Sequence, residues 1–194
     1  RRSSGAVACW GFNGYGQVGD GTTTDHLTPT PVIGLTDAVE VATGTYHACA
    51  RHRSGAVACW GYNSSGQLGD GTATDRFTPT PVLGLADAIG ISAGTEHSCA
   101  LRGSGEIVCW GGNRYGELGD GTIDSHPMPT PVRGLSDAVQ VLAGANRSCA
   151  RRTSGAIVCW GINVFGDIGD GTTIERHTPT EVSDLAGAVD ISAG

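Results

Sequence analysis

The sequence predicts an all-β fold, a β-propeller of four-stranded blades, on the basis of an internal repeat, a high glycine content and a recurring tryptophan motif. The segment CWGYNSSGQLGDGT at 59–72 returns in nearly the same form from positions 9, 109 and 159, so the period is about 50 residues. Such a period is typical of arrays whose units bury their faces against their neighbours. Glycine supplies 32 of 194 residues, and strong helical periodicity is absent, which favours short strands and tight turns. We expect one propeller array over 1–194, with four repeats at approximately 1–44, 45–94, 95–144 and 145–194.

One repeat predicts four short strands. Residues 38–44 (AVEVATG) alternate apolar and small residues, 46–50 (YHACA) are small and apolar, and 55–61 (GAVACWG) are apolar on both faces. Residues 78–82 (TPTPV) predict an edge strand, because proline cannot donate to a ladder. A four-stranded sheet repeated in tandem is the blade of a β-propeller.

Residues that recur in every copy are predicted to be structural. Glycines such as Gly66 and Gly69 indicate turns with positive φ or close backbone approach, and asparagines such as Asn63 suit turns that bond to their own backbone. We expect the tryptophans to pack between neighbouring sheets: Trp10, Trp60, Trp110 and Trp160.

The segment SCALRGSGEIVCWGGNRYGELGDGT, with PTPVRGLSDAVQVLAG after it, resembles the repeat of the regulator of chromosome condensation family in its bacterial-like, cysteine-containing form. It carries that repeat's W-G-x-N-x-x-G-Q-L-G core, and the resemblance covers the whole chain. The fourth copy departs from the pattern, with Glu181 in place of proline and Asp184 in place of glycine. Because the family usually closes a ring of seven blades, the resemblance implies a partial propeller or one completed by oligomerisation.

The ends of the chain also carry an expectation. The chain begins after the strand that would precede Arg1 in the repeat and stops at Gly194, before the next such strand. We therefore expect one of three cases: a piece of a longer propeller, a propeller completed by a partner chain, or a designed protein whose ends were chosen by its designer. Open blade edges predict self-association.

The cysteines predict disulfides across hairpins. If 53–55 form a three-residue turn, Cys49 and Cys59 face each other within disulfide distance. The spacing predicts three such pairs: Cys49–Cys59, Cys99–Cys109 and Cys149–Cys159. Cys9 is expected to be unpaired in this chain, with its partner in a strand before Arg1. Three pairs indicate an oxidising location, extracellular or in the cell envelope, and buried free thiols in a cytosolic protein are the alternative.

Histidine does not predict catalysis here. His47 and His97 share one repeat position, but the third copy has Arg147, so we expect a histidine that closes the blade through a side-chain hydrogen bond. Phosphate-binding loops, nucleophile elbows and zinc-protease motifs are absent from the sequence. We expect no enzyme activity and no cofactor.

Aspartates recur in the loops as pairs, the best being Asp20 with Asp25 and Asp70 with Asp75. Calcium is a conceivable ligand, since it takes several oxygen donors. The D-x-D-x-D-G order is absent, so we expect these carboxylates to cap backbone N–H groups in turns instead, and no metal site.

Charge and hydropathy exclude two classes of partner. The net charge is −7, the pI is near 5.2, and basic residues form no stripe, so neither nucleic acid nor an anionic membrane is expected. No apolar run approaches the roughly 20 residues that span a bilayer.

Positions that differ between copies predict the functional surface, because the fold does not determine them. Aromatic and charged residues at loop tips anchor protein contacts. The candidates for partner contact are Tyr15, Tyr46, His47, Arg76, Phe77, Glu96, Arg114, Tyr115, Arg147 and Phe165.

The predicted function is a non-enzymatic protein–protein interaction scaffold with an unknown partner. One alternative is a designed or purely structural array that self-assembles. The resemblance implies two others: nucleotide exchange on the small GTPase Ran, as in the founding member, or inhibition of a secreted hydrolase, as in bacterial propellers that inhibit β-lactamases. Exchange in that family depends on an inserted wedge, and the constant spacing of the copies shows no insertion.

Overall fold

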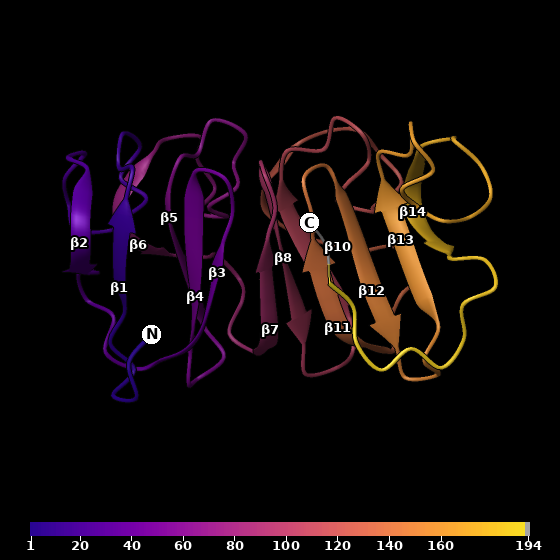
Figure 1. Ribbon diagram of the computed structural model, residues 1–194, viewed down its shortest axis with the longest axis horizontal. Helices are drawn as coiled ribbons and strands as arrows, with labels where there is room; N and C mark the ends of the chain where they lie inside the picture. The colour runs from indigo at the N-terminus through magenta and orange to yellow at the C-terminus, as the bar shows by residue number, and fades with distance from the viewer. Residues whose placement is uncertain (193–194) are drawn as a thin grey trace.

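The computed structural model describes residues 1–192 and is all-β, with three four-stranded antiparallel sheets and one two-stranded sheet (Figure 1). The first sheet pairs β1 (Ala8–Gly11) with β2 (His26–Pro31). The second contains β3 (Ala38–Thr43), β4 (His47–His52), β5 (Val57–Gly61) and β6 (Arg76–Pro81). The third contains β7 (Ala88–Ala93), β8 (His97–Arg102), β9 (Ile107–Gly111) and β10 (His126–Pro131). The fourth contains β11 (Ala138–Ala143), β12 (Arg147–Arg152), β13 (Ile157–Gly161) and β14 (Arg176–Glu181).

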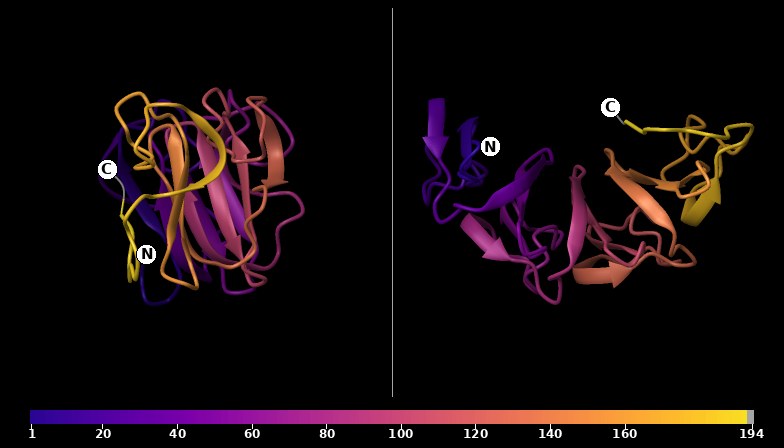
Figure 2. Two further views of the ribbon diagram at one scale, coloured as in Figure 1. Left: turned by 90° about the vertical axis from the view of Figure 1, so that its right-hand side faces the viewer. Right: turned by 90° about the horizontal axis from the view of Figure 1, so that it is seen from below.

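The sheets stand side by side around a common axis and form an open arc, which the right-hand view of Figure 2 shows. Strands β3, β7 and β11 contact one another along the inner side of the arc. Strands β6, β10 and β14 are the outer edges of their sheets, so the proline-containing segments form edge strands as predicted. The architecture confirms the predicted β-propeller blades. No helix within residues 1–192 is long and apolar enough to cross a membrane.

Hairpin register brings the cysteines together. Arg51 faces Val57 and Cys49 faces Cys59, which leaves 53–55 as the three-residue turn that the sequence predicts. The Cα atoms of that pair are 4.0 Å apart, and disulfides join Cys49–Cys59, Cys99–Cys109 and Cys149–Cys159. Cys9 forms no disulfide within the described residues.

Three tryptophans pack between sheets as predicted. Trp60, Trp110 and Trp160 are completely buried. Their Nε1 atoms donate to backbone carbonyls of the preceding repeat, at Gln17 (2.9 Å), Gln67 (2.9 Å) and Glu117 (2.8 Å) respectively.

Trp160 also explains one of the recurrent glycines. A Cβ on Gly119 would lie 2.6 Å from Trp160 Nε1, so only glycine allows the indole to approach this closely. The prediction is wrong for Trp10, which is 62% exposed. In the described chain no preceding repeat lies beside the first sheet, and it is the preceding repeat that covers the other three tryptophans.

Buried histidines link neighbouring sheets. The hydroxyl of Ser98 donates to the carbonyl of Gln67 (2.9 Å), so His47 Nε2 is the donor in its 2.8 Å bond to Ser98 Oγ. His97 and Ser148 repeat the arrangement at 2.9 Å. The predicted histidine hydrogen bond therefore exists, but it joins two blades rather than closing one. Burial lowers the pKa of His47 to about 4, and burial together with the charge of His47 lowers that of His97 to about 3.

Asparagine and aspartate organise the long loops. Asn63 is fully buried and its Nδ2 donates to the carbonyls of Thr72 (3.1 Å) and Thr74 (2.9 Å), while Leu68 N donates to its Oδ1 (2.9 Å). Asp70 accepts from Thr72 N at 3.0 Å. These bonds are the turn chemistry that the sequence predicts, and they hold each long loop in one shape.

Asp184 preserves a turn after its glycine is lost. It has a φ of 54°, in the left-handed region that Gly34, Gly84 and Gly134 occupy in the other copies. Asp184 is the one non-glycine residue with positive φ in the part of the chain that the structure describes. The backbone of the fourth copy therefore keeps the turn although its sequence departs from the pattern.

Candidate functional site

The variable residues gather at one end of the sheets. Because the strands are antiparallel, loops that follow the first and third strands of a sheet lie at the same end. We call this end the upper loop face; it lies along the upper edge in Figure 1. It comprises the loops 12–25, 62–75, 112–125 and 162–175 and the shorter loops 44–46, 94–96 and 144–146.

Most of the predicted contact residues lie on this face. The upper loops carry Tyr15, Tyr46, Glu96, Arg114, Tyr115 and Phe165. Arg147 is the first residue of β12, directly below. Two others lie toward the outer rim: Arg76 Nε donates to Asp70 Oδ2 (2.7 Å), and Phe77 packs against Gly16 of the preceding repeat. His47 is 1% exposed, so its assignment as a contact residue is wrong; the hydrogen bond to Ser98 keeps it in the interior.

The face has a repeated junction wherever a long loop meets the next sheet, and the first junction is aromatic. The ring of Tyr15 lies 5.2 Å from that of Tyr46 and 4.8 Å from that of Tyr62, between centroids. Phe12 adds an edge contact to Tyr15 at 6.1 Å. Phe12 and Tyr62 escaped the sequence prediction, although both occupy the variable position of the W-G-x-N motif. Phe12 and Tyr46 are exposed, so the cluster presents aromatic surface to solvent.

The second junction is hollow. Ser65 and Gly112 occupy the places that Tyr15 and Tyr62 fill at the first junction, and Glu96 replaces Tyr46. A pocket of about 300 Å³ opens there. Glu96 lies across Gly112, where an added Cβ would be 3.2 Å from the Glu96 Cβ, and its Oε2 accepts from Ser65 Oγ at 3.0 Å.

Glu117 contributes a second carboxylate to this pocket and is only 3% exposed. Its Oε2 accepts from the N–H of Tyr115 at 2.7 Å. Burial raises the pKa of Glu117, and the negative charge of Glu96 raises it further. The sequence prediction missed Glu117; the signal was the change from Gln17 and Gln67 to a charged residue at the same repeat position.

The third junction is ion-paired, and its residues Tyr115 and Asn146 also line the pocket. The guanidinium carbon of Arg114 lies 5.7 Å from the centre of the Tyr115 ring, a cation–π arrangement. Arg147 Nη1 pairs with Asp167 Oδ1 at 3.4 Å. Phe165 extends from the last long loop and is 90% exposed.

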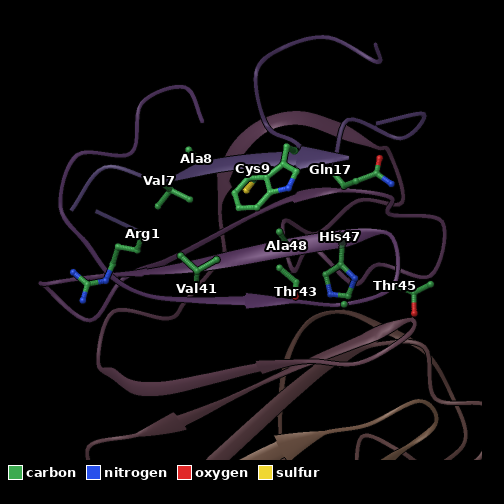
Figure 3. A pocket seen from close by; sticks show the side chains of 12 residues that line it. Arg1, Val7, Ala8, Cys9, Gln17, Val41, Thr43, Thr45, His47 and Ala48 are labelled. Atoms are coloured by element: carbon green, nitrogen blue, oxygen red, sulfur yellow. The ribbon is translucent and has the colours of Figure 1, made fainter. Parts of the chain in front are cut away.

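A different pocket, of about 320 Å³, lies beside β1 (Figure 3). Its lining is mainly apolar and includes Val7, Cys9, Val41 and Ala48. Strand β5 of the second sheet corresponds to β1, and β4 pairs with its edge, with β3 beyond. The pocket therefore lies along the edge of β1 that is unpaired in the described chain and is not a group of reactive side chains. Burial raises the pKa of the Cys9 thiol. Within the residues described, no three His, Cys, Asp or Glu side chains come together as a metal site requires.

Solved structures confirm the architecture. Yeast RCC1 (Prp20), crystallised with Kap60 bound to it, is 25% identical with a TM-score of 0.81; the match covers 93% of this chain and 45% of that one. A second structure, Prp20p from Saccharomyces cerevisiae, described with its binding properties to Gsp1p and histones, is 23% identical with a TM-score of 0.79, covering 91% and 46%. The ectodomain of the receptor kinase CR4 from Physcomitrella patens is 26% identical with a TM-score of 0.52, covering 86% and 38%.

The chain thus spans a little under half of the length of the two yeast chains. The Regulator of chromosome condensation (RCC1) repeat matches its sequence three times, over residues 4–51, 54–101 and 104–151. A second profile of the same repeat matches 38–67, 88–117 and 138–167. With the tryptophan, asparagine and glycine motifs in register in every copy and the blades formed as they predict, this chain belongs to the regulator of chromosome condensation repeat family.

Proposed function

We propose that the chain is a non-enzymatic protein-binding scaffold whose partner docks on the upper loop face. One observation supports this most: the residues that build the blades repeat, whereas the junctions on this face differ, being aromatic at the first, hollow and acidic at the second, and ion-paired at the third. A face that varies over a constant frame is how propellers supply specific contacts. The yeast relative, which was crystallised with a protein bound, has the same architecture.

Site-specific photo-crosslinking tests this proposal. A photo-reactive benzoylphenylalanine at position 46, in the upper loops, should capture one discrete protein from the native source. The same group at position 104, in a turn at the opposite end of the sheets, is the matched control and should capture none. Adding Tyr15→Ala should weaken the capture at position 46 several-fold. Equal capture from both positions, or capture indifferent to Tyr15, would contradict the proposal.

We further propose that the protein works outside the cytosol, in the extracellular space or cell envelope. Three disulfides at equivalent places support an oxidising location. Alkylation of the protein as isolated, followed by mass spectrometry without reductant, should label one thiol, at Cys9. Seven labelled thiols would contradict the proposal and would indicate a reducing compartment.

Self-association is a second candidate, supported by the apolar groups exposed at the two ends of the arc. Leu27 in β2 is 95% exposed, and Val189 near the other end is 87% exposed. Strand β1 also pairs with β2 alone in the described chain, and an unpaired strand edge favours pairing with another chain. Native mass spectrometry should then show oligomers that Leu27→Ser reduces; a monomer at all concentrations would contradict it.

Nucleotide exchange has a direct test of its own. Release of a fluorescent GDP analogue from a panel of small GTPases should show no acceleration by the chain, since we propose a scaffold. Accelerated release that Tyr46→Ala abolishes would replace the scaffold with an exchange factor acting from the same face.

A further inference from the structure

We propose that the pocket at the second junction binds a basic side chain of the protein partner, best matched by the guanidinium group of arginine. This inference rests on the proposed protein-binding function and specifies which chemistry the upper loop face recognises. Three features carry it: an opening where the first junction holds rings, two carboxylates that form no ion pair within the described residues, and an aromatic wall.

The opening follows from the chain's own repeats. At the first junction Tyr15, Tyr46 and Tyr62 pack ring against ring. The second junction has Ser65 and Gly112 at the places of the outer two rings, and the fold around them is unchanged: Trp110 Nε1 still donates to Gln67 O at 2.9 Å. The pocket of about 300 Å³ is therefore the volume of missing side chains in a rigid frame.

Arg114 also lines this pocket, but within the described residues it forms no ion pair with either carboxylate. Several partly buried carboxylates elsewhere pair with cations, such as Asp70 with Arg76 at 2.7 Å and Asp137 with Arg152 at 2.9 Å. Within residues 1–192, neither Glu96 nor Glu117 pairs with a cationic side chain. Ser65 Oγ is the donor to Glu96, and Tyr115 N is the donor to Glu117.

The environment of Glu117 makes a cation favourable. Burial of an ionised carboxylate without a partner costs free energy, and a nearby second carboxylate adds repulsion. Glu117 is 3% exposed and shares the pocket lining with Glu96. A cation that enters the pocket offsets both costs at once, so these residues gain more from a basic ligand than an exposed surface pair would.

The walls favour arginine among basic groups. Tyr115, Asn146 and Arg114 line the pocket beside the carboxylates, and the guanidinium carbon of Arg114 lies 5.7 Å from the centre of the Tyr115 ring. A guanidinium is planar, stacks on aromatic rings and donates in a fork to carboxylate oxygens, whereas an ammonium is a point charge with a tight hydration shell. The exposed aromatic cluster of the first junction lies next along the same face and offers apolar contact to residues that flank the arginine.

The test is a ¹⁵N NMR titration of the whole chain with Nα-acetyl-L-arginine amide, and with the citrulline analogue as a neutral probe of nearly equal shape. We expect saturable shifts at the amides of Gly112, Tyr115 and Glu117 with the arginine probe and at least tenfold weaker binding of the citrulline probe. Glu117→Gln installs the residue that the chain already uses at 17 and 67, so the fold should persist while arginine binding falls about tenfold.

Two further variants test whether the probe binds in the pocket or is attracted only by the negative charge of the protein. Ser65→Tyr restores a ring of the first junction and should abolish binding by filling the pocket. Glu106→Gln removes an exposed carboxylate at the opposite end of the sheets and should leave binding unchanged. Equal shifts from both probes, undiminished binding by Glu117→Gln, or shifts from calcium chloride with none from arginine would overturn the assignment.

The outcomes also distinguish this inference from the scaffold proposal. A failed titration with intact photo-capture at position 46 removes the arginine pocket and leaves the scaffold. Arginine binding without any capture keeps the pocket and removes the docked protein.

Discussion

Strands β1 and β2 of the first sheet correspond in sequence to β9 and β10 of the third sheet, yet their surroundings differ. Trp10 is 62% exposed, and Trp110 is completely buried. Cys9 is unpaired in the described chain, and Cys109 is bonded to Cys99. The difference teaches that the tryptophan of this repeat is buried only where the preceding repeat lies beside it, as it does for Trp160 in the last sheet. The cysteine needs the preceding strand of its own sheet, as in Cys149–Cys159. Four experiments follow from this comparison, from the largest expected effect to the smallest.

Truncation of the matched tryptophans should separate the two sheets most clearly. Trp110→Ala should lower the free energy of unfolding by about 3–5 kcal/mol, because it empties a buried site. Trp10→Ala should cost less than about 0.5 kcal/mol, because water already reaches that ring. Urea unfolding followed by circular dichroism measures both, and losses of similar size would contradict the comparison.

Acid should weaken the junctions between complete sheets. His47 and His97 stay neutral when folded, with pKa values lowered to about 4 and about 3, whereas the unfolded side chains titrate near 6.5. Stability is therefore unaffected above pH 6.5 and is lost as the pH falls, by about 1.4 kcal/mol per pH unit for each histidine and by about 3 kcal/mol for His47 at pH 4.

The first junction lacks this histidine–serine hydrogen bond, because Ala48 stands there in place of Ser98 and Ser148. His97→Gln should flatten the pH dependence of unfolding between pH 4.5 and 6.5 by about 1.4 kcal/mol per unit. Trp10→Ala should retain the slope of the unmodified chain. An unchanged slope in His97→Gln would show that this histidine is not the acid-sensitive group.

Removal of cysteines should also destabilise the third sheet more than the first, with a smaller difference in the free energy of unfolding. The Cys99→Ala, Cys109→Ala double variant should lose about 2–3 kcal/mol, since the disulfide closes a short loop in the unfolded chain. Cys9→Ala should change stability by less than about 0.5 kcal/mol, because no bond is lost. Thermal unfolding without reductant measures both, and reductant should bring the double variant and the parent closer together.

The smallest effect concerns the fourth copy. Asp184 holds a φ of 54°, where glycine pays no steric cost. Asp184→Gly should stabilise the chain by at most about 1 kcal/mol, and Gly84→Asp should destabilise the second copy by a similar amount. Urea midpoints of the two variants test the pair; a loss of stability in Asp184→Gly would show that the carboxylate has a role of its own.

Much of this structure could be read from local pattern. The period, the hairpin turn at 53–55 and the facing of Cys49 and Cys59 are short-range features that register alone decides. The proline segments could be placed at edges because a missing N–H is a property of one residue. The upper loop face was predicted in part, since variable residues such as Tyr46 and Glu96 identify it without any contact being known.

The misses were residues whose role depends on a neighbouring repeat. The repeat position of His47 holds Arg147 in another copy, and this variation suggested an exposed side chain. His47 is instead hydrogen-bonded to Ser98 in the next repeat. Glu117 and Gly112 look like ordinary substitutions, and their meaning appears only when Ser65 from the preceding repeat lies beside them. Trp10 was expected to be buried because its motif is intact, and its exposure depends on which sheets surround it.

The sequence by itself determined the blade, because strand period, turn glycines, proline edges and cysteine register all act within one repeat. Only the tertiary structure decided the junctions between blades: which histidine is buried, which tyrosines stack, and where a pocket with two carboxylates opens. The physical reason is how far apart along the sequence the contacting residues lie. A stretch shorter than one period, such as 38–81, contains every strand of a sheet, whereas each junction joins side chains from neighbouring sheets and depends on how those sheets pack.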